Sequence, residues 1–202
     1  MSSKGGLILK DKYRLRNLFL GLLIIVIIYM IILLLSGARF TPIQVVKTSP
    51  GIDKSSVLLG TVSSSPYKVF VYENTDKYRT ILVKYKFPFW RSDSSSWANK
   101  TDDKVKLVGW CSYSDGRNGI TVVPVQSFDD NVAYIKMGSG ADLQQKMIKA
   151  GEVLLFSWTK SIRWNDLNAI AYSSDNKELY KLEYEIVNST IHPDGLRWLP
   201  SK

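Results

Sequence analysis

The chain contains few residues whose types and spacing could support catalysis. Its single histidine, His192, stands beside Pro193 in a stretch that reads as a loop, and its single cysteine, Cys111, lies far from it in the sequence. One histidine does not build a usual zinc site. The Gly-x-Ser-x-Gly motif of serine hydrolases is absent, and the serines cluster in Ser-rich runs. We therefore predict no catalytic residue, no metal site and no cofactor.

The carboxylates and the cysteine have simpler structural explanations. Asp102-Asp103 and Asp129-Asp130 are adjacent pairs, and neighbouring residues on a strand point to opposite faces of a sheet. Neither pair can form an acid–base couple by itself, so we interpret both as turn residues. Cys111 lies between Trp110 and Ser112 in an expected strand, where a buried small hydrophobic residue is the simpler explanation.

The strongest candidate for a binding surface is the segment KFPFWRSDSSSWANK, residues 86–100. Its Ser-rich part is too polar for a typical strand, which predicts a loop. Aromatic side chains on such a loop can stack on a sugar ring or anchor a protein partner. The candidate contacts are Phe89, Trp90, Arg91 and Trp97. In the alternative, which we favour because large aromatics mostly pack inside, Phe89 and Trp90 close one end of the core. We expect Trp90 to be partly buried and Trp97 to be more exposed.

A long apolar segment near the N-terminus determines where the β-domain lies relative to a membrane. The run from Leu18 to Leu35 carries no charged residue. A helix of this length crosses a hydrocarbon core of about 30 Å, and a helix satisfies its own backbone groups in lipid. We therefore predict a transmembrane helix over residues 18–36, with the lipid bilayer as its partner.

The charges around this run predict its orientation. Residues 1–17 form a basic tail in which Asp11 is the only acid. An excess of basic residues favours the cytoplasmic side, so the tail is expected inside and the rest of the chain outside. The basic residues of the tail are Lys4, Lys10, Lys12, Arg14 and Arg16.

Cleavage of the leader is the alternative to retention. Ser36-Gly37-Ala38 offers the small residues that a signal peptidase prefers, and a cut near Ala38 would give a secreted form. A signal peptide normally has an apolar region of about 7–15 residues, and this one is longer. The length favours a retained anchor.

The charge balance narrows the partners of the outer part. The chain carries a net charge of +9, of which the tail holds +4, and the remaining +5 is spread along the sequence. Such a diffuse charge does not indicate a nucleic-acid partner. An envelope protein or an anionic wall polymer is a possible partner. A single cysteine in an exported chain is more typical of Gram-positive envelopes than of disulfide-rich secretion.

The outer part reads as a spacer followed by a β-domain. Residues 37–56 contain two prolines and two glycines, which predicts a spacer. Residues 57–202 show apolar alternation with a period of two, broken by turn residues. Within this domain, Pro124 is expected on an edge strand or at a bulge, because proline has no backbone N–H to donate to a neighbouring strand. Residues 140–152 could form a helix or an edge strand.

The successive hairpins of residues 105–187 end in LNAIAYSSDNKELYKLEYE. They resemble the immunoglobulin-like sandwich modules of uncharacterised single-span exported proteins from Bacillus-type Gram-positive bacteria. The resemblance implies an all-β sandwich of eight or nine antiparallel strands on one N-terminal transmembrane helix, without catalytic residues. Paired cysteines like those of antibody domains are absent.

Together these features predict a membrane-anchored extracytoplasmic module of the cell envelope with a non-enzymatic binding or structural role. The alternative is an envelope hydrolase or transferase that acts on wall polymer. Such an enzyme would need carboxylates brought together from separate loops, ideally about 5–10 Å apart in an aromatic-lined cleft.

Overall fold

The computed structural model describes residues 4–187 and 190–201. Within these residues the chain forms two α-helices, thirteen β-strands and two 3₁₀ turns. Their bounds are α1 Lys4–Leu35, α2 Pro42–Lys47, β1 Val57–Ser64, β2 Tyr67–Glu73, β3 Lys77–Lys86, β4 Phe89–Asn99, β5 Val105–Leu107, β6 Cys111–Ser114, β7 Gly119–Ser127, β8 Tyr134–Met137, η1 Gly140–Asp142, β9 Gln144–Met147, β10 Val153–Trp158, η2 Trp164–Asp166, β11 Ile170–Tyr172, β12 Glu178–Val187 and β13 Thr190–Pro200.

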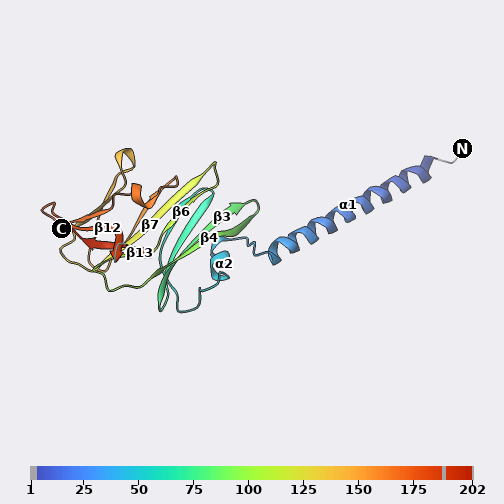
Figure 1. Ribbon diagram of the computed structural model, residues 1–202. Coiled ribbons are helices and arrows are strands. Elements are labelled where there is room, and N and C mark those ends of the chain that lie inside the picture. The colour runs from blue at the N-terminus through green and yellow to red at the C-terminus, as the bar shows by residue number, and fades with distance from the viewer. Residues whose placement is uncertain (1–3, 188–189, 202) are drawn as a thin grey trace.

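The apolar run forms one long helix that projects from the β-domain (Figure 1). Its part from Tyr13 to Leu35 is long and apolar enough to cross a membrane and is not covered by the rest of the chain. At 1.5 Å per residue, these 23 residues extend about 35 Å. The predicted apolar helix is therefore confirmed as a candidate membrane anchor or signal sequence.

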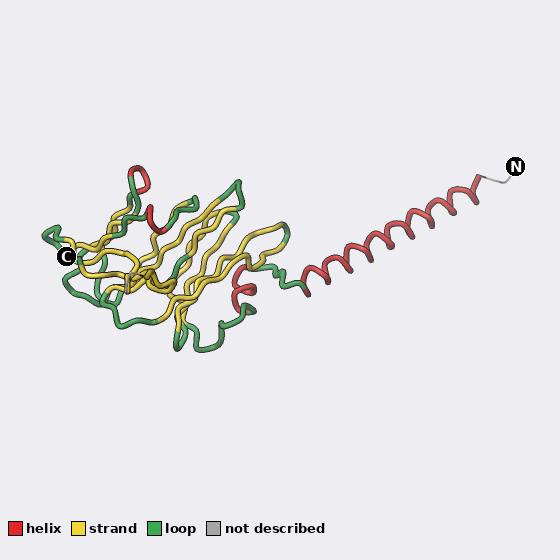
Figure 2. Tube along the Cα trace, in the orientation of Figure 1, coloured by secondary structure: helices red, strands yellow, loops and turns green. Residues whose placement is uncertain are grey.

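The rest of the described chain is mostly β, as predicted, and its strands form three antiparallel sheets (Figure 2). We name them by their distance from α1. The proximal sheet has the order β1-β2-β3-β4, the middle sheet β10-β7-β5 with β6 also on β7, and the distal sheet β13-β12-β11-β8-β9. The C-terminus lies at the end of the domain away from α1 (Figure 1).

The number of strands exceeds the eight or nine expected. Residues 105–114 contain two short strands, β5 and β6, and the Ser-rich part of residues 86–100 is also a strand. The expected loop around His192 belongs to β13, although its side chain lies outside the described residues. Short polar strands are missed because apolar alternation signals only strands with one buried face.

The three sheets pack as successive layers with β7 near the centre. Ile120 and Val122 contact the proximal sheet, whereas Val123 and Val125 contact the distal sheet. Because successive side chains of a strand point to opposite faces, a strand between two layers must be apolar on both. The run GITVVPVQ is buried along most of its length for this reason.

The segment 37–56, predicted to be a spacer, packs against the proximal sheet. Thr41 caps α2 in a capping box with Gln44, and Pro42 occupies the first turn, where its missing donor costs nothing. Val45 and Val46 are then buried against the outer face of the proximal sheet. The prolines and glycines shape turns around a packed helix, so this part is not an extended linker.

Pro124 lies in the central strand β7, so an edge position is wrong. The strand is nevertheless interrupted beside it, because β5 ends opposite Val125 and β6 begins opposite Val122. The N–H of Val108 donates to the Pro124 carbonyl at 3.1 Å across this break. Since the N and O atoms of a strand residue point to the same side, the missing donor of proline faces the interruption.

The sequence predicted either a helix or an edge strand for residues 140–152. This segment contains a single 3₁₀ turn and the edge strand β9. Strand β9 pairs with β8 at one edge of the distal sheet. The strand alternative is therefore confirmed.

Candidate functional site

The aromatic segment forms strand β4, and the predicted loop is wrong. β4 pairs with β3 from Lys86 opposite Phe89 to Lys77 opposite Asn99. It is the last strand of the proximal sheet, and an edge strand tolerates polar side chains because part of it faces water. The serine run shows no apolar alternation, but its backbone hydrogen bonds to β3 hold it in a strand.

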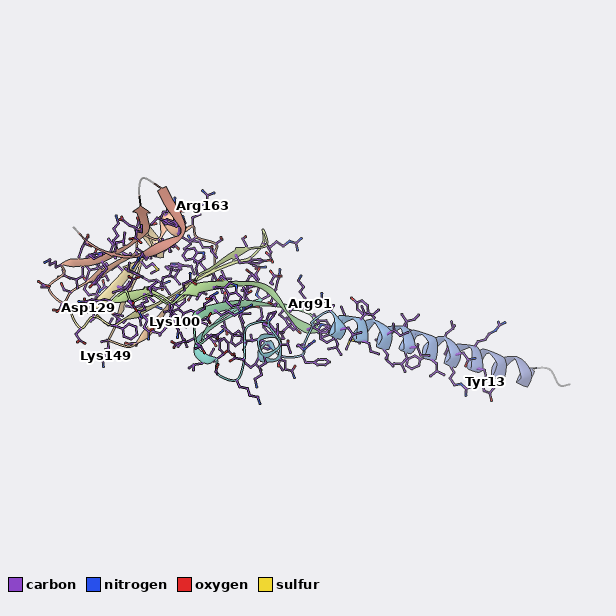
Figure 3. All side chains as sticks on the ribbon, turned by 60° about the horizontal axis from the view of Figure 1, so that its bottom comes forward. Tyr13, Arg91, Lys100, Asp129, Lys149 and Arg163 are labelled. Atoms are coloured by element: carbon purple, nitrogen blue, oxygen red, sulfur yellow. The ribbon has the colours of Figure 1, made fainter. Side chains whose placement is uncertain are left out.

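The first residues of β4 pair with the chain that leaves α1. The N–H of Arg39 donates to the Trp90 carbonyl at 2.9 Å, and the N–H of Trp90 donates back to Arg39 at 2.7 Å. Arg91 donates from Nη2 to Ser36 Oγ at 3.2 Å. Figure 3 shows Arg91 where α1 meets the β-domain. The end of the apolar helix is thus tied into the proximal sheet.

Aromatic side chains gather at this end of β4. Phe89 is 2% exposed and packs on Phe40 with 5.0 Å between ring centroids. Trp90 is half-buried and lies 5.1 Å from the Tyr85 ring, and the ammonium of Lys68 lies 5.7 Å from the Trp90 centroid. The expectation that Trp90 is partly buried is confirmed.

A cavity of about 270 Å³ opens beside Trp90, and we call it the proximal groove. Burial raises the pKa of Tyr67 to about 12, so this phenol stays neutral at physiological pH. Aromatic faces, hydroxyls and one ammonium can together hold a small polar ligand such as a sugar or an anionic group. The groove is lined by Ser63, Ser65, Pro66, Tyr67, Lys68, Tyr85 and Trp90.

The fourth candidate, Trp97, lies at the other end of β4. It lies seven positions along the strand from Trp90, about 23 Å at 3.3 Å per residue. It is 55% exposed, which confirms that it is the more exposed of the two tryptophans. The structure therefore brings Phe89, Trp90 and Arg91 together and leaves Trp97 apart from them.

Trp97 covers a buried cation. The Arg79 guanidinium lies 3.9 Å from the Trp97 centroid, and Arg79 is only 4% exposed. Its Nη2 donates to Ser95 Oγ at 3.2 Å, whereas Nε and Nη1 have no partner among the described residues. Burial lowers the pKa of Arg79. The exposed tryptophan thus shields an incompletely bonded guanidinium, a role that its polar sequence surroundings did not indicate.

A second cavity, of about 240 Å³, includes Asp142 and Asp166 in its lining and was not predicted from the sequence. Asp142 forms an ion pair with Lys160, which also lines the cavity. The lining residues that the structure describes include no aromatic side chain. The two aspartates are 24 positions apart in turns, and no local pattern relates them.

One carboxylate of each pair that the sequence singled out has structural partners. Asp129 is 7% exposed, and the Tyr180 hydroxyl donates to it at 2.6 Å, which lowers its pKa. Asp103 accepts hydrogen bonds from Arg197, one of them from Nε at 3.2 Å. These contacts connect loops to the distal sheet.

Cys111 is buried, as expected, and burial raises its pKa to about 11. A thiol with so high a pKa carries almost no thiolate at neutral pH and is a poor nucleophile. In the part of the chain that the structure describes, no cluster of three His, Cys, Asp or Glu side chains could hold a metal ion.

Comparisons with protein-family models, with curated proteins and with solved structures found no match to this chain.

Proposed function

We propose that the protein is a membrane-anchored extracytoplasmic module of the cell envelope with a non-enzymatic binding or structural role. The observation that carries this proposal is that residues up to the cleavage point near Ala38 already contact the β-domain. Arg91 donates from Nη2 to Ser36 Oγ at 3.2 Å and Ala38 is fully buried, so the end of the apolar helix is part of the folded domain. A leader that is removed after export has no need of such contacts.

The orientation rests on the charges of the tail. Residues 1–17 are basic and stay in the cytoplasm, and the β-domain lies outside. Protease added to intact spheroplasts should digest the chain beyond residue 40 and leave the tail protected. If the tail is digested and the β-domain stays intact, the orientation is the opposite of the one proposed.

The proximal groove is the proposed ligand site. Trp90 and Tyr85 offer aromatic faces for stacking, and Lys68 offers a positive charge over the Trp90 ring. Phe89 packs on Phe40 and does not line the groove, and Trp97 does not belong to it. The ligand class is an envelope protein or a wall polymer with sugar and anionic groups.

Binding of purified wall polymer to the full chain in detergent tests the site. Trp90→Ala should weaken binding much more than Trp97→Ala, because Trp97 lies far from the groove. Equal losses in the two variants, or none in either, would contradict the proposal. Circular dichroism of each variant separates lost binding from lost folding.

We also propose that the middle and distal sheets correspond to the immunoglobulin-like part of the chain. The support is that two antiparallel sheets face each other across the largest core. An experimental structure in which these sheets do not share a core would overturn this assignment.

An envelope hydrolase or transferase is the second candidate function. One observation favours it, namely that Asp142 and Asp166 line the same cavity. Purified wall polymer incubated with the full chain tests it through release of soluble fragments. Activity that disappears in Asp142→Asn and Asp166→Asn would support catalysis, and no release by the unmodified chain would dismiss it.

A further inference from the structure

Large apolar side chains lie exposed beside the end of α1. Phe87 occupies the two-residue turn between β3 and β4 and is 87% exposed. Phe40, which follows the helix, is 56% exposed. Figure 1 shows this hairpin next to the junction with α1. Two exposed phenylalanine side chains at one end of a domain indicate a contact surface.

Basic side chains accompany these aromatics. Lys86 is exposed beside Phe87. Arg39 donates from Nη1 to the carbonyls of Leu34 and Ala38, both at 2.8 Å, and so caps the C-terminal end of the helix. Of the acidic groups on neighbouring elements, Asp115 is paired with Lys84 and Asp93 is exposed on β4. The surface is therefore basic as well as aromatic.

The position of this surface relative to α1 is constrained. The backbone pairing of Arg39 with Trp90 and the packing of Phe40 on Phe89 hold the start of β4 beside the helix end. The hairpin cannot move far from the helix unless these contacts break. If α1 crosses a bilayer, the hairpin turn must lie near the bilayer surface.

We infer that Phe40, Lys86 and Phe87 form a membrane-contact face, which rests in the anionic headgroup region of the bilayer that α1 crosses. This inference rests on the proposed retention of α1. Aromatic rings are favoured at the boundary between headgroups and acyl chains, because the ring can contact the apolar chains and the polar headgroups at the same time. Basic side chains add attraction to anionic lipid. The β-domain is thereby held in one orientation on the membrane, with the distal sheet pointing away.

Spin-label depth measurements on the full chain test the inference. Cys111→Ser provides a background without native cysteine, and single cysteines are then introduced by Phe87→Cys, Tyr29→Cys or Lys149→Cys. Tyr29 lies within α1, and Lys149 is exposed at the far end of the domain (Figure 3). Each labelled chain is placed in nanodiscs of phosphatidylcholine with phosphatidylglycerol. Relaxation by oxygen, which enters lipid, is compared with relaxation by a water-soluble nickel chelate.

The label at position 29 should show the highest ratio of oxygen to nickel accessibility, and the label at position 149 the lowest. We expect the ratio at position 87 to be several-fold higher than at 149. If position 29 lies in lipid and position 87 is as water-accessible as position 149, the proposed membrane-contact face is wrong, whereas the proposed transmembrane anchor is supported. If position 29 is also in water, the proposed anchoring itself fails.

The charge contribution is tested with a matched pair of variants. Lys86→Gln removes a cation of the membrane-contact face, and Lys149→Gln removes one at the far end of the domain. Replacing phosphatidylglycerol by phosphatidylcholine should lower the ratio at position 87. Lys86→Gln should reduce this dependence on anionic lipid, and Lys149→Gln should leave it unchanged. Equal effects of the two substitutions would contradict a specific role for Lys86.

Discussion

Both ends of strand β4 carry a tryptophan close to an arginine, but the two ends have different structural roles. At one end Phe89, Trp90 and Arg91 connect the β-domain to α1 through backbone pairing, ring packing and a hydrogen bond. At the other end Trp97 lies on the surface and covers the guanidinium of Arg79. An aromatic residue near an arginine is thus part of a junction in one place and a lid over a buried cation in the other.

The difference comes from what each end of the strand faces. The first end meets the chain that leaves α1, which supplies Ser36, Arg39 and Phe40 as partners. The far end meets Gly51, which leaves space for the Trp97 ring because it has no side chain. Partners that are distant in sequence therefore decide the role of each aromatic residue.

The largest effect is expected for Phe89→Ala. Phe89 is fully buried at the junction, and truncating a buried phenylalanine costs about 3–5 kcal/mol of unfolding free energy. Thermal unfolding of the full chain in detergent measures the loss. Phe87→Ala, two residues away and exposed, is the matched control and should change stability by less than about 0.5 kcal/mol. Similar values for both variants would mean that the junction is not packed.

Gly51→Ala should come next. Gly51 has a φ of 77°, and a Cβ there would lie 2.6 Å from Arg79 Nη1 and 2.9 Å from the Trp97 ring. The left-handed conformation alone costs about 1–3 kcal/mol for a residue with a side chain. Gly116→Ala has a similar φ of 86° with nothing within 4 Å, so it measures this conformational cost without the steric clash. The account requires Gly51→Ala to be the more destabilising of the two.

Trp97→Ala should have a smaller effect. It removes the ring that covers Arg79, and a partly desolvated cation–π contact is worth about 1–2 kcal/mol. Trp97→Phe should retain part of this stability because a face remains over the guanidinium. A loss in Trp97→Ala as large as that of Phe89→Ala, measured by the same melting curves, would remove the distinction between the two ends.

The smallest effect is expected for Asp115→Asn, which concerns the pair between Asp115 and Lys84 near the junction. The hydrogen bond from Lys84 lowers the pKa of Asp115 below its ordinary value of 3.8. Its contribution to stability is therefore present above pH 3.8 and is lost as the pH falls through the lower pKa of the folded state. The stability difference between the two proteins should narrow in acid, as melting curves at pH 7 and at lower pH can measure. A difference that widens in acid would mean that this pairing is wrong.

The apolar helix and the β class were predictable because both follow from local pattern. The run from Leu18 to Leu35 is uncharged, and the alternation in residues 67–87 is strong. The burial of Cys111 and the contrast between Trp90 and Trp97 also followed from their immediate neighbours.

What could not be predicted depends on partners distant in the sequence. The serines of β4 form a strand because β3 supplies a backbone ladder, which no side-chain pattern reports. Val45 and Val46 form only a short apolar pair, and their burial depends on the outer face of the proximal sheet. The covering of Arg79 by Trp97 requires Gly51, which lies 46 positions before that tryptophan.

The central claim is that α1 remains joined to the β-domain, and the mass of the mature protein tests it most directly. The chain is expressed in a Gram-positive bacterium and purified from the membrane fraction, and its intact mass is measured. We expect a membrane-bound chain near the full 22.9 kDa. Recovery of a soluble protein that begins at Arg39 would contradict it.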